Sequence, residues 1–585
     1  MRKKEELLEE EEDLELATNR MLMILRVLIF TIVPIVLFYL MEAFEHNGFE
    51  EVRSQAQLYN IFLFELIAWL LFFITGSGCI ALRIETVIAL LYGLINHYVM
   101  AFRSTPLVPW DVFSIGTAAS VAGNYDFTPT KELLMVCGGF GLIFILLQFV
   151  KLKFDQGVFL RIIPTICIGI VLCTFVNLLW DEEFQTDSYL YPFLFTPAHM
   201  TKVNGMAVTF AMDMEYIFVD KPDGYSEKKA EAILEEYTTE GDATFEQDYP
   251  NIVVIMNEAF SDLAVLGDFE TNEDYMPFVH RLQQGYENTV TGNLMVSVCG
   301  GNTANTEFEF LTGHTMDYFP VGSIPYQQYI TGEIPSMASQ LKELGYATYG
   351  MHPYNYTGWN RNKVYPWLGF EEAYFVRDFE DRRYIRDYVS DRSAYEKIID
   401  VFENKEADTP AFIFQVTMQN HGGYTKEYDY FTSDVHAEDL NSAQLDQYLS
   451  LIKISDRELE RLVDYFSQQE ENTIIVFFGD HQPSDAVVRP ILRLNGVNTS
   501  NMSMEQAQLR YQVPYVIWAN YDIEEESNVD TDISFLAADV LKRADMPTTA
   551  YQNFLLELEK SPDSEKLLNQ YEILQYYFMF DYQEE

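Results

Sequence analysis

The sequence predicts a helical membrane region followed by an α/β domain with a mainly parallel central sheet. Long apolar runs occupy the first part of the chain, at about 21–43, 57–76, 79–101, 132–151 and 159–180. From residue 250 onward, short apolar runs alternate with helical patterns, as they do when helices cover both faces of a parallel sheet. The chain has 585 residues, too many for one compact domain, which agrees with two regions.

Each of the long apolar runs is near the roughly 20 residues that a helix needs to cross a hydrocarbon core. Buried core helices are the alternative, and so many long runs in succession disfavour it. The first run is too long for a cleaved signal peptide, and further runs follow it. We therefore predict a cytoplasmic N-terminal tail over residues 1–20 and a five-span transmembrane domain over residues 21–180.

The orientation in the membrane follows from the positions of Lys and Arg, which favour the cytoplasmic side. Basic residues precede the first run and separate the fourth from the fifth: Arg2, Lys3, Lys4, Arg20, Lys151, Lys153 and Arg161. Acidic residues follow the last run, at Asp181, Glu182 and Glu183. With the N-terminus inside and an odd number of spans, everything after about residue 181 is expected outside the cell.

The charge of the chain limits its partners. There are 89 acidic and 38 basic residues, a formal net charge of −51. Nucleic-acid binding needs a basic face, so it is excluded. An anionic substrate must be held by a metal ion or by a few placed cations. Cys299 is the one cysteine of the five outside the apolar half, which excludes an internal disulfide and a cysteine-rich zinc site there.

After the spans, residues 181–248 are expected to form a helical connector, in which Ser226 caps a helix that runs to about Tyr237. Residues 249–548 form the α/β domain, and residues 549–585 a polar helical tail. Strands are predicted at 252–256, 347–351, 411–416 and 473–478, with an antiparallel strand near 515–518. Helices are predicted at about 335–344, 394–404 and 442–468.

Polar side chains follow several of the predicted strands directly. Glu258 follows the first strand, His421 lies beyond the third, and Asp480 and His481 follow the fourth. The carboxyl ends of parallel strands share one edge of a sheet, so these residues can meet there. Carboxylate and imidazole ligands suit Mn²⁺, Mg²⁺ or Zn²⁺. The alternative for Asp480 and His481 is a turn in which the aspartate caps the next helix and the histidine has no role.

The segment Cys299-Gly-Gly-Asn-Thr303 has the composition of a nucleophile turn. Glycines precede a hydroxyl residue and a predicted helix start, whose free N–H groups can hold an anion. A Thr hydroxyl needs a metal ion or a base to attack at neutral pH. The alternative is that Thr303 only caps the helix.

Together these motifs resemble the lipoteichoic acid synthase branch of the alkaline phosphatase/sulfatase superfamily. The matching pieces are Glu258, Gly301-Asn302-Thr303-Ala304-Asn305-Thr306-Glu307, Trp359-Asn360-Arg361, Asn420-His421 and Gly479-Asp480-His481. The resemblance implies that Glu258, Thr303, Asp480 and His481 bind one Mn²⁺, and that Thr303 is the nucleophile. It also implies that Trp359, Arg361 and His421 hold a phosphoglycerol headgroup.

The function implied is a metal-dependent phosphotransferase in the cell membrane of a Gram-positive-type bacterium. It would move glycerol phosphate from phosphatidylglycerol to a glycolipid or a polyglycerolphosphate chain through a phospho-threonine. Phosphoethanolamine transfer and phosphodiester or sulfate-ester hydrolysis are the enzymatic alternatives. A formylglycine sulfatase is disfavoured, because Cys299 is not followed by the Pro and Arg that such enzymes need. A non-catalytic surface protein is the third class.

Overall fold

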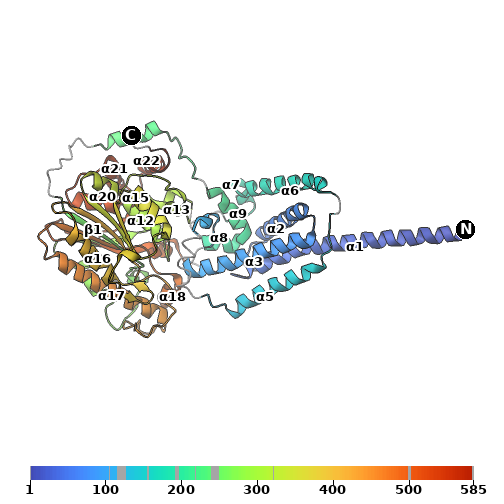
Figure 1. Ribbon diagram of the computed structural model, residues 1–585, viewed down its shortest axis with the longest axis horizontal. Coiled ribbons are helices and arrows are strands. Elements are labelled where there is room, and N and C mark those ends of the chain that lie inside the picture. Colours follow the sequence, from blue (N-terminus) through green and yellow to red (C-terminus); the bar gives the residue numbers. More distant parts are fainter. Residues whose placement is uncertain are drawn as a thin grey trace. The chain divides into compact units, whose positions relative to one another are not determined.

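The computed structural model describes residues 2–103, 106–114, 127–154, 157–191, 197–217, 219–238, 249–320, 322–497 and 502–582. The chain forms two compact units, coloured from blue to red along the sequence in Figure 1. The first comprises Met1–Pro109 and Phe127–Phe218, and the second comprises Trp110–Asp126 and Val219–Glu585.

The first unit is helical. Its long helices are α1 (Arg2–Glu42), α2 (Ser54–Thr75), α3 (Gly78–Arg103), α5 (Lys131–Leu146) and α6 (Val158–Leu179). Among the described residues, five segments are long and apolar enough to span a membrane: Arg20–Glu42, Ser54–Thr75, Gly78–Ala101, Lys131–Phe149 and Val158–Leu179. They match the five predicted spans within a few residues. The acidic N-terminal segment continues into the first span as one helix.

Three short helices follow within the same unit: α7 (Glu182–Asp187), α8 (Pro197–Asn204) and α9 (Met206–Asp213). Backbone amides of α9 form hydrogen bonds with polar side chains of the long helices. The amide of Met206 donates to Oε1 of Glu42 at 2.8 Å, and the amide of Val208 donates to Oδ1 of Asn60 at 3.0 Å. Buried polar groups are tolerated where they find such partners, so α9 is fixed against α1 and α2.

The second unit contains an eight-stranded sheet of order β10-β2-β9-β8-β1-β7-β3-β4. The strands are β1 (Asn251–Asn257), β2 (Thr289–Met295), β3 (Ala347–His352), β4 (Glu372–Phe375), β7 (Ala411–Val416), β8 (Thr473–Gly479), β9 (Gln512–Ala519) and β10 (Thr531–Asp532). A separate hairpin consists of β5 (Tyr384–Ile385) and β6 (Tyr388–Val389).

The centre of the sheet is parallel, as predicted. β8, β1, β7, β3 and β4 run in one direction, whereas β9 is antiparallel to both β8 and β2. The four predicted strands correspond to β1, β3, β7 and β8, and the predicted antiparallel strand to β9. β2, β4, β10 and the hairpin were not predicted.

Helices cover both faces of this sheet (Figure 1). One face packs against α12 (Thr303–Thr312), α14 (Met337–Glu343) and α20 (Ile533–Arg543). The other packs against α11 (Pro277–Gln283), α16 (Asp391–Asn404), α17 (Ala443–Phe466) and α18 (Asp485–Leu494). Successive residues of β1 alternate between the two cores, with Val254 in the first and Val253 in the second. Burial on both faces explains why the central strands are continuous apolar runs.

The connector helix α10 (Glu227–Glu236) packs against the C-terminal helices α21 (Ala550–Glu559) and α22 (Glu565–Tyr576). Ala230 and Ile233 of α10 share a buried cluster with Phe554 and Leu574. Ser226 caps α10 as predicted, because its side chain accepts from the amide of Lys229. Shorter helices are α13 (Pro325–Gln328), α15 (Arg361–Trp367) and α19 (Met504–Gln508).

Candidate metal centre and transfer site

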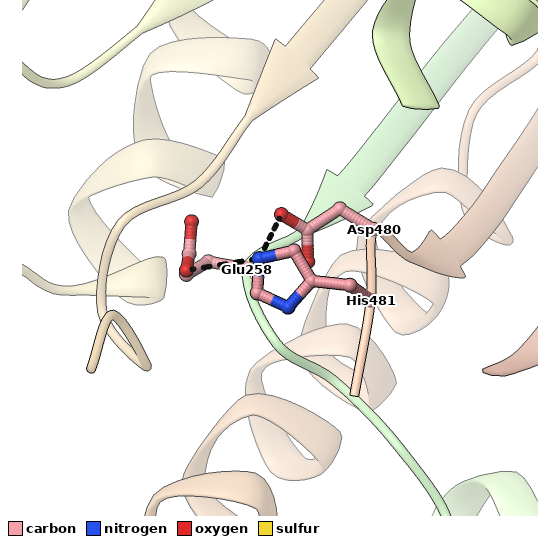
Figure 2. A group of neighbouring side chains, drawn as sticks. All are labelled: Glu258, Asp480 and His481. Atoms are coloured by element: carbon pink, nitrogen blue, oxygen red, sulfur yellow. Dashed lines mark ion pairs between the residues drawn. The ribbon is translucent and has the colours of Figure 1, made fainter. Parts of the chain in front are cut away.

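Glu258, Asp480 and His481 meet at the carboxyl edge of the sheet (Figure 2). Each offers one ligand atom, and these atoms lie within 4.8 Å of one another in a buried cluster. The register of the sheet explains the meeting, because Asn257 at the end of β1 pairs with Gly479 at the end of β8. The next residue of each chain segment, Glu258 and Asp480, therefore emerges at the same point.

The turn after β1 holds Asp480 in place. Ala259 has a φ of 51°, and its amide donates to Oδ1 of Asp480 at 2.7 Å. Close approach of this turn requires a glycine at position 479, since a Cβ there would lie 1.9 Å from the carbonyl oxygen of Phe260. The second carboxylate oxygen, Oδ2, has no hydrogen-bond partner among the described residues.

The ring of His481 presents Nε2 to these carboxylates. Nδ1 lies 2.9 Å from the carbonyl oxygen of Gln482, which can only accept, so Nδ1 carries a proton and Nε2 is the ring nitrogen left to bind a metal ion. Nε2 lies 3.3 Å from Oδ2 of Asp480 and 3.8 Å from Oε1 of Glu258. Neither Nε2 of His481 nor Oδ2 of Asp480 has a hydrogen-bond partner among the described residues, so both atoms are available to bind a metal ion. The donor set therefore fits a divalent metal ion.

Electrostatics at Glu258 agree with this arrangement. Burial raises the pKa of Glu258 well above its ordinary value, and the nearby charge of Asp480 raises it further. Two neighbouring buried carboxylates, such as those of Glu258 and Asp480, cannot both be charged without a compensating cation. A bound divalent ion would supply that compensation.

Thr303 begins α12 and faces the metal-ligand cluster. Its hydroxyl donates to Oε2 of Glu258 at 3.5 Å. The N-cap residue of α12 is Asn302, which has a φ of 67° and makes no side-chain capping bond. Thr303 is thus the first residue inside the helix and not its cap. Thr306, one turn further on, donates instead to the carbonyl oxygen of Asp480 at 2.8 Å.

Arg361 begins α15 and is bound to α12. Its Nε donates to Oε1 and Oε2 of Glu307 at 2.9 and 3.2 Å, its Nη2 also donates to Oε1, and both side chains are buried. The hydroxyl of Tyr365 adds a bond to Oε2 of Glu307 at 3.0 Å. Interaction with Glu307 and Tyr365 keeps the pKa of Arg361 above its ordinary value, although burial opposes this. The guanidinium is therefore permanently charged beside the site.

Trp359 precedes this arginine in a strained turn. Backbone angles φ in the left-handed region occur at one predicted site residue, Trp359, and at three non-glycine neighbours of predicted site residues: Ala259, Asn302 and Asn360. Such angles are unfavourable for these residues and are often found where a site requires a particular geometry.

His421 lies beyond β7, beside the β5–β6 hairpin. Its Nδ1 is 2.9 Å from the hydroxyl oxygen of Tyr388. Burial is the main cause that lowers the pKa of His421 to about 3, and the neighbouring side chains of His481 and Arg386 contribute to the same shift. The imidazole is therefore neutral at physiological pH, which suits a hydrogen-bonding role.

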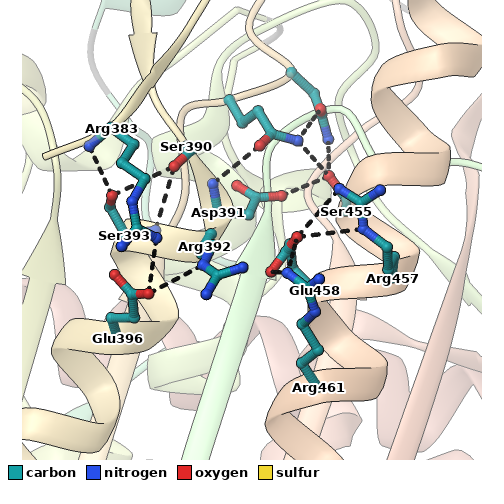
Figure 3. A network of polar contacts seen from close by, with 12 residues as sticks. Arg383, Ser390, Asp391, Arg392, Ser393, Glu396, Ser455, Arg457, Glu458 and Arg461 are labelled. Carbon is teal, nitrogen blue, oxygen red and sulfur yellow. Dashed lines mark hydrogen bonds and ion pairs between the residues drawn. The ribbon is translucent and has the colours of Figure 1, made fainter.

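A buried polar network fixes the segments that carry Glu258 and His421, and Figure 3 shows the part of it around Asp391 and Ser455. Asn257 accepts from Nδ2 of Asn420 at 2.9 Å and donates to Oδ2 of Asp391 at 2.9 Å. Ser455 of α17 donates to Asp391 of α16 and accepts from Asn420. Burial raises the pKa of Asp391 to about 6. This network joins β1, the His421 loop and two helices.

Two residues near the site did not emerge from the sequence. Arg386 is buried, with Nη2 donating to the carbonyl oxygens of Gln419 and His421 at 3.0 and 2.7 Å. Tyr388 contacts His421 as described above. The sequence does contain a pattern that could have indicated these residues. In Tyr384-Ile-Arg-Asp-Tyr-Val389, two short runs of strand-forming residues flank a two-residue turn, which is typical of a β-hairpin.

Comparison with known proteins places this geometry in a family. The sequence profile of the sulfatase family matches residues 250–546. A protein of Rhizobium meliloti (strain 1021), whose name refers to modification of cyclic beta-1,2-glucan, is 30% identical over 68% of this chain and 59% of its own length. Lipoteichoic acid synthase 1 of Bacillus subtilis (strain 168) is 24% identical over 48% of this chain and 45% of its own length. The chain thus spans about half the length of these relatives.

Solved structures share the fold. Phosphoglycerol transferase GacH of Streptococcus pyogenes, in complex with sn-glycerol-1-phosphate, superposes with a TM-score of 0.52 at 21% identity, covering 62% of this chain and 96% of that one. Phosphoethanolamine transferase A of Neisseria meningitidis, an integral membrane protein, gives 0.50 at 12% identity, covering 88% of this chain and 95% of that one. The protein belongs to the sulfatase family, is built as a membrane-spanning helical region followed by a sulfatase-like domain, and counts lipoteichoic acid synthases among its relatives.

Proposed function

We propose that the protein transfers glycerol phosphate from phosphatidylglycerol to a sugar hydroxyl of a glycan or glycolipid, through a phosphoglycerol-threonine intermediate on Thr303. The observation that carries the proposal is the Thr303 hydroxyl, which lies at the start of α12 and faces Glu258 in the metal-ligand cluster. Similarity to a phosphoglycerol transferase supports the choice of headgroup.

Glu258, Thr303, Asp480 and His481 would hold one divalent cation, Mn²⁺ or alternatively Mg²⁺ or Zn²⁺. Such an ion neutralises charge on the transferring phosphoryl group and favours ionisation of a nearby hydroxyl. The protein itself supplies two further positive features for the phosphate. These are the backbone N–H groups at the start of α12 and the guanidinium of Arg361.

The first step forms a bond between Oγ1 of Thr303 and the phosphorus of phosphatidylglycerol. The bond between phosphorus and the diacylglycerol oxygen breaks, and diacylglycerol leaves with the proton that Thr303 loses. In the second step an acceptor hydroxyl attacks the same phosphorus. The bond between phosphorus and Oγ1 of Thr303 breaks, and the proton of the acceptor hydroxyl returns to Oγ1. Trp359 and His421 flank the glycerol headgroup in this proposal, and Arg361 faces the phosphate through Nη1, because Nε and Nη2 bind Glu307.

The five apolar helices suit a lipid donor, because they would keep the site near the membrane surface. The Lys and Arg distribution supports a location of the catalytic unit outside the cell, where it would reach lipids of the outer leaflet. The relative with glucan modification in its name favours a glycan acceptor. A polyglycerolphosphate chain is the second candidate acceptor, which the similarity to lipoteichoic acid synthase favours.

The experiment uses the purified full-length protein with vesicles of phosphatidylglycerol or phosphatidylethanolamine, in the presence of Mn²⁺, Mg²⁺ or Zn²⁺. We expect release of diacylglycerol from phosphatidylglycerol, and a chelator should abolish it. Release from phosphatidylethanolamine alone would show a phosphoethanolamine transferase. Release of phosphatidic acid or inorganic phosphate, without diacylglycerol, would contradict the proposed bond cleavage.

A further inference from the structure

An aromatic pocket of about 560 Å³ opens beside the proposed transfer site. Its lining includes Tyr354, Tyr356, Phe375, Arg377, Tyr384 and Tyr388. These residues come from the loop after β3, the end of β4 and the β5–β6 hairpin, none of which supplies a metal ligand. A volume in this range suits a small ligand or one to two sugar rings.

Tyr388 connects the pocket to the transfer site. Its hydroxyl is 2.9 Å from Nδ1 of His421, and the two rings lie 5.1 Å apart. The ring of Tyr354 lies 6.4 Å from the ring of Tyr388 and 6.2 Å from the ring of His352, which ends β3. The pocket therefore begins where the proposed headgroup position ends.

The chemistry of the lining suits a sugar. Tyr356 and Tyr384 are each 51% exposed, unusual for large aromatic side chains, and Tyr356 packs beside Phe375 with ring centroids 6.3 Å apart. Sugar rings present C–H groups on their faces and hydroxyls at their edges, so they pack on aromatic rings while polar groups bind their rims. Asn355 and Arg377 supply such polar groups here.

The charges of the lining disfavour a polyanion. Among the lining residues that the structure describes, Arg377 is the single cation, and Asp378 and Asp387 are carboxylates. Asp387 is already bound by Lys426 at 2.9 Å and by the hydroxyl of Tyr428 at 2.7 Å. A chain of phosphodiesters would need several unpaired cations, whereas an uncharged sugar needs none.

We propose that this pocket binds an uncharged sugar ring of the acceptor and directs one of its hydroxyls toward the phosphoglycerol on Thr303. This assignment gives the sugar acceptor of the proposed transferase a binding pocket and rests on that function. Tyr356 and Tyr384 provide the stacking surfaces, and Arg377 and Asn355 bind hydroxyls at the rim.

The test compares Tyr356→Ala and Tyr384→Ala with wild type and with Tyr286→Ala, an exposed tyrosine that is not part of the pocket. The probes are a β-1,2-linked glucotriose and a glycerol phosphate trimer, added to the full chain in detergent. Binding is measured first, without phosphatidylglycerol, by saturation-transfer NMR. Transfer and diacylglycerol release are then measured with phosphatidylglycerol present, and thermal melts verify folding.

We expect glucotriose to bind wild type and Tyr286→Ala, and the KM for glucotriose to rise by about tenfold or more in the two pocket variants. Diacylglycerol release without acceptor should stay within about twofold of wild type. The pocket assignment is wrong if glucotriose does not bind, if its binding survives both substitutions, or if the substitutions weaken only the glycerol phosphate trimer. Loss of diacylglycerol release in wild type would instead refute the transferase, while the binding experiment would still decide the pocket.

Discussion

Arg361 and Glu307 form a buried, forked ion pair in which Nε of the arginine donates to both carboxylate oxygens at 2.9 and 3.2 Å. Glu307 lies four residues after Thr303 on α12, so the pair fixes the loop that carries Trp359 to the helix that carries the proposed nucleophile. The sequence resemblance implies that Arg361 holds a phosphate. The structure shows that Arg361 also binds Glu307 of α12, the helix that begins with Thr303.

We expect Arg361→Lys to lower the transfer rate by about 10²-fold or more, because an ammonium group cannot bind Glu307 and a phosphate at once. Replacing the forked guanidinium with an ammonium group should also lower stability, by less than the roughly 3–5 kcal/mol that removal of one partner of a buried ion pair costs. Rates of diacylglycerol release and thermal melts measure the two effects. The double variant Arg361→Leu/Glu307→Leu is the control, because it removes both charges. If the double variant recovers both stability and activity, Arg361 has only a structural role.

Metal removal should abolish activity without unfolding the protein. The cluster of Glu258, Asp480 and His481 leaves Oδ2 of Asp480 and Nε2 of His481 without hydrogen-bond partners among the described residues, so a cation should bind there. Metal analysis after dialysis against Mn²⁺ should find one ion per chain, and His481→Gln should reduce its affinity by about tenfold or more. Two ions per chain, or unchanged affinity in His481→Gln, would contradict the single site.

Stability should depend on His280, at the end of α11. Its Nδ1 is 2.9 Å from Oδ1 of Asp274 and its Nε2 is 3.5 Å from Oδ2 of Asp262. The bond to Asp262 is the main reason that the pKa of His280 rises from 6.5 to about 9. A raised pKa means that the folded state binds the proton more tightly, so the stabilisation is complete below pH 6.5 and is lost as pH rises toward about 9.

Thermal melts of wild type and His280→Gln from pH 5.5 to pH 9.5 test this. The difference between their midpoints should be largest at the acidic end and should shrink steadily above pH 6.5. Diacylglycerol release should be unchanged, because His280 is not part of the site. If the difference between the melting midpoints of wild type and His280→Gln grows with pH, the prediction is wrong.

The membrane orientation can be tested with an impermeant thiol reagent on intact cells. In a background without the five native cysteines, Glu10→Cys should be protected and Leu440→Cys labelled. Permeabilised cells serve as the control for reactivity at both positions. The reverse pattern would place the sulfatase-like unit in the cytoplasm and remove its access to an outer-leaflet acceptor.

The sequence predicted those features that follow from burial and register. β1, β7 and β8 are buried on both faces and therefore appear as unbroken apolar runs. Strand β2 was missed because Gly292 interrupts its apolar pattern. A glycine is needed at this position because a Cβ there would lie 1.8 Å from the carbonyl oxygen of Val529. The glycine thus reflects close backbone packing by a segment far along the chain, which local pattern does not reveal.

At the site, the meeting of Glu258, Asp480 and His481 could be predicted because neighbouring parallel strands end at one edge. The pairing of Arg361 with Glu307 could not, since it depends on the side-chain conformations of two helices. The same is true of Arg386 and Tyr388, whose contacts with His421 depend on how a short hairpin packs against a loop. Hydrogen bonds from side chains to distant loops have no periodic signature in the sequence.

The most direct test of the account is the covalent intermediate on Thr303. Thr303→Val removes the hydroxyl at nearly constant volume, and Thr306→Val does the same one turn away, where the hydroxyl binds the carbonyl oxygen of Asp480. We expect loss of several orders of magnitude, about 10³-fold or more, for Thr303→Val and retention of most activity for Thr306→Val. Peptide mass spectrometry after incubation with phosphatidylglycerol and no acceptor should find phosphoglycerol on Thr303 in wild type and in Thr306→Val. A folded Thr303→Val that releases diacylglycerol near the wild-type rate, with no modified peptide in wild type, would contradict the mechanism.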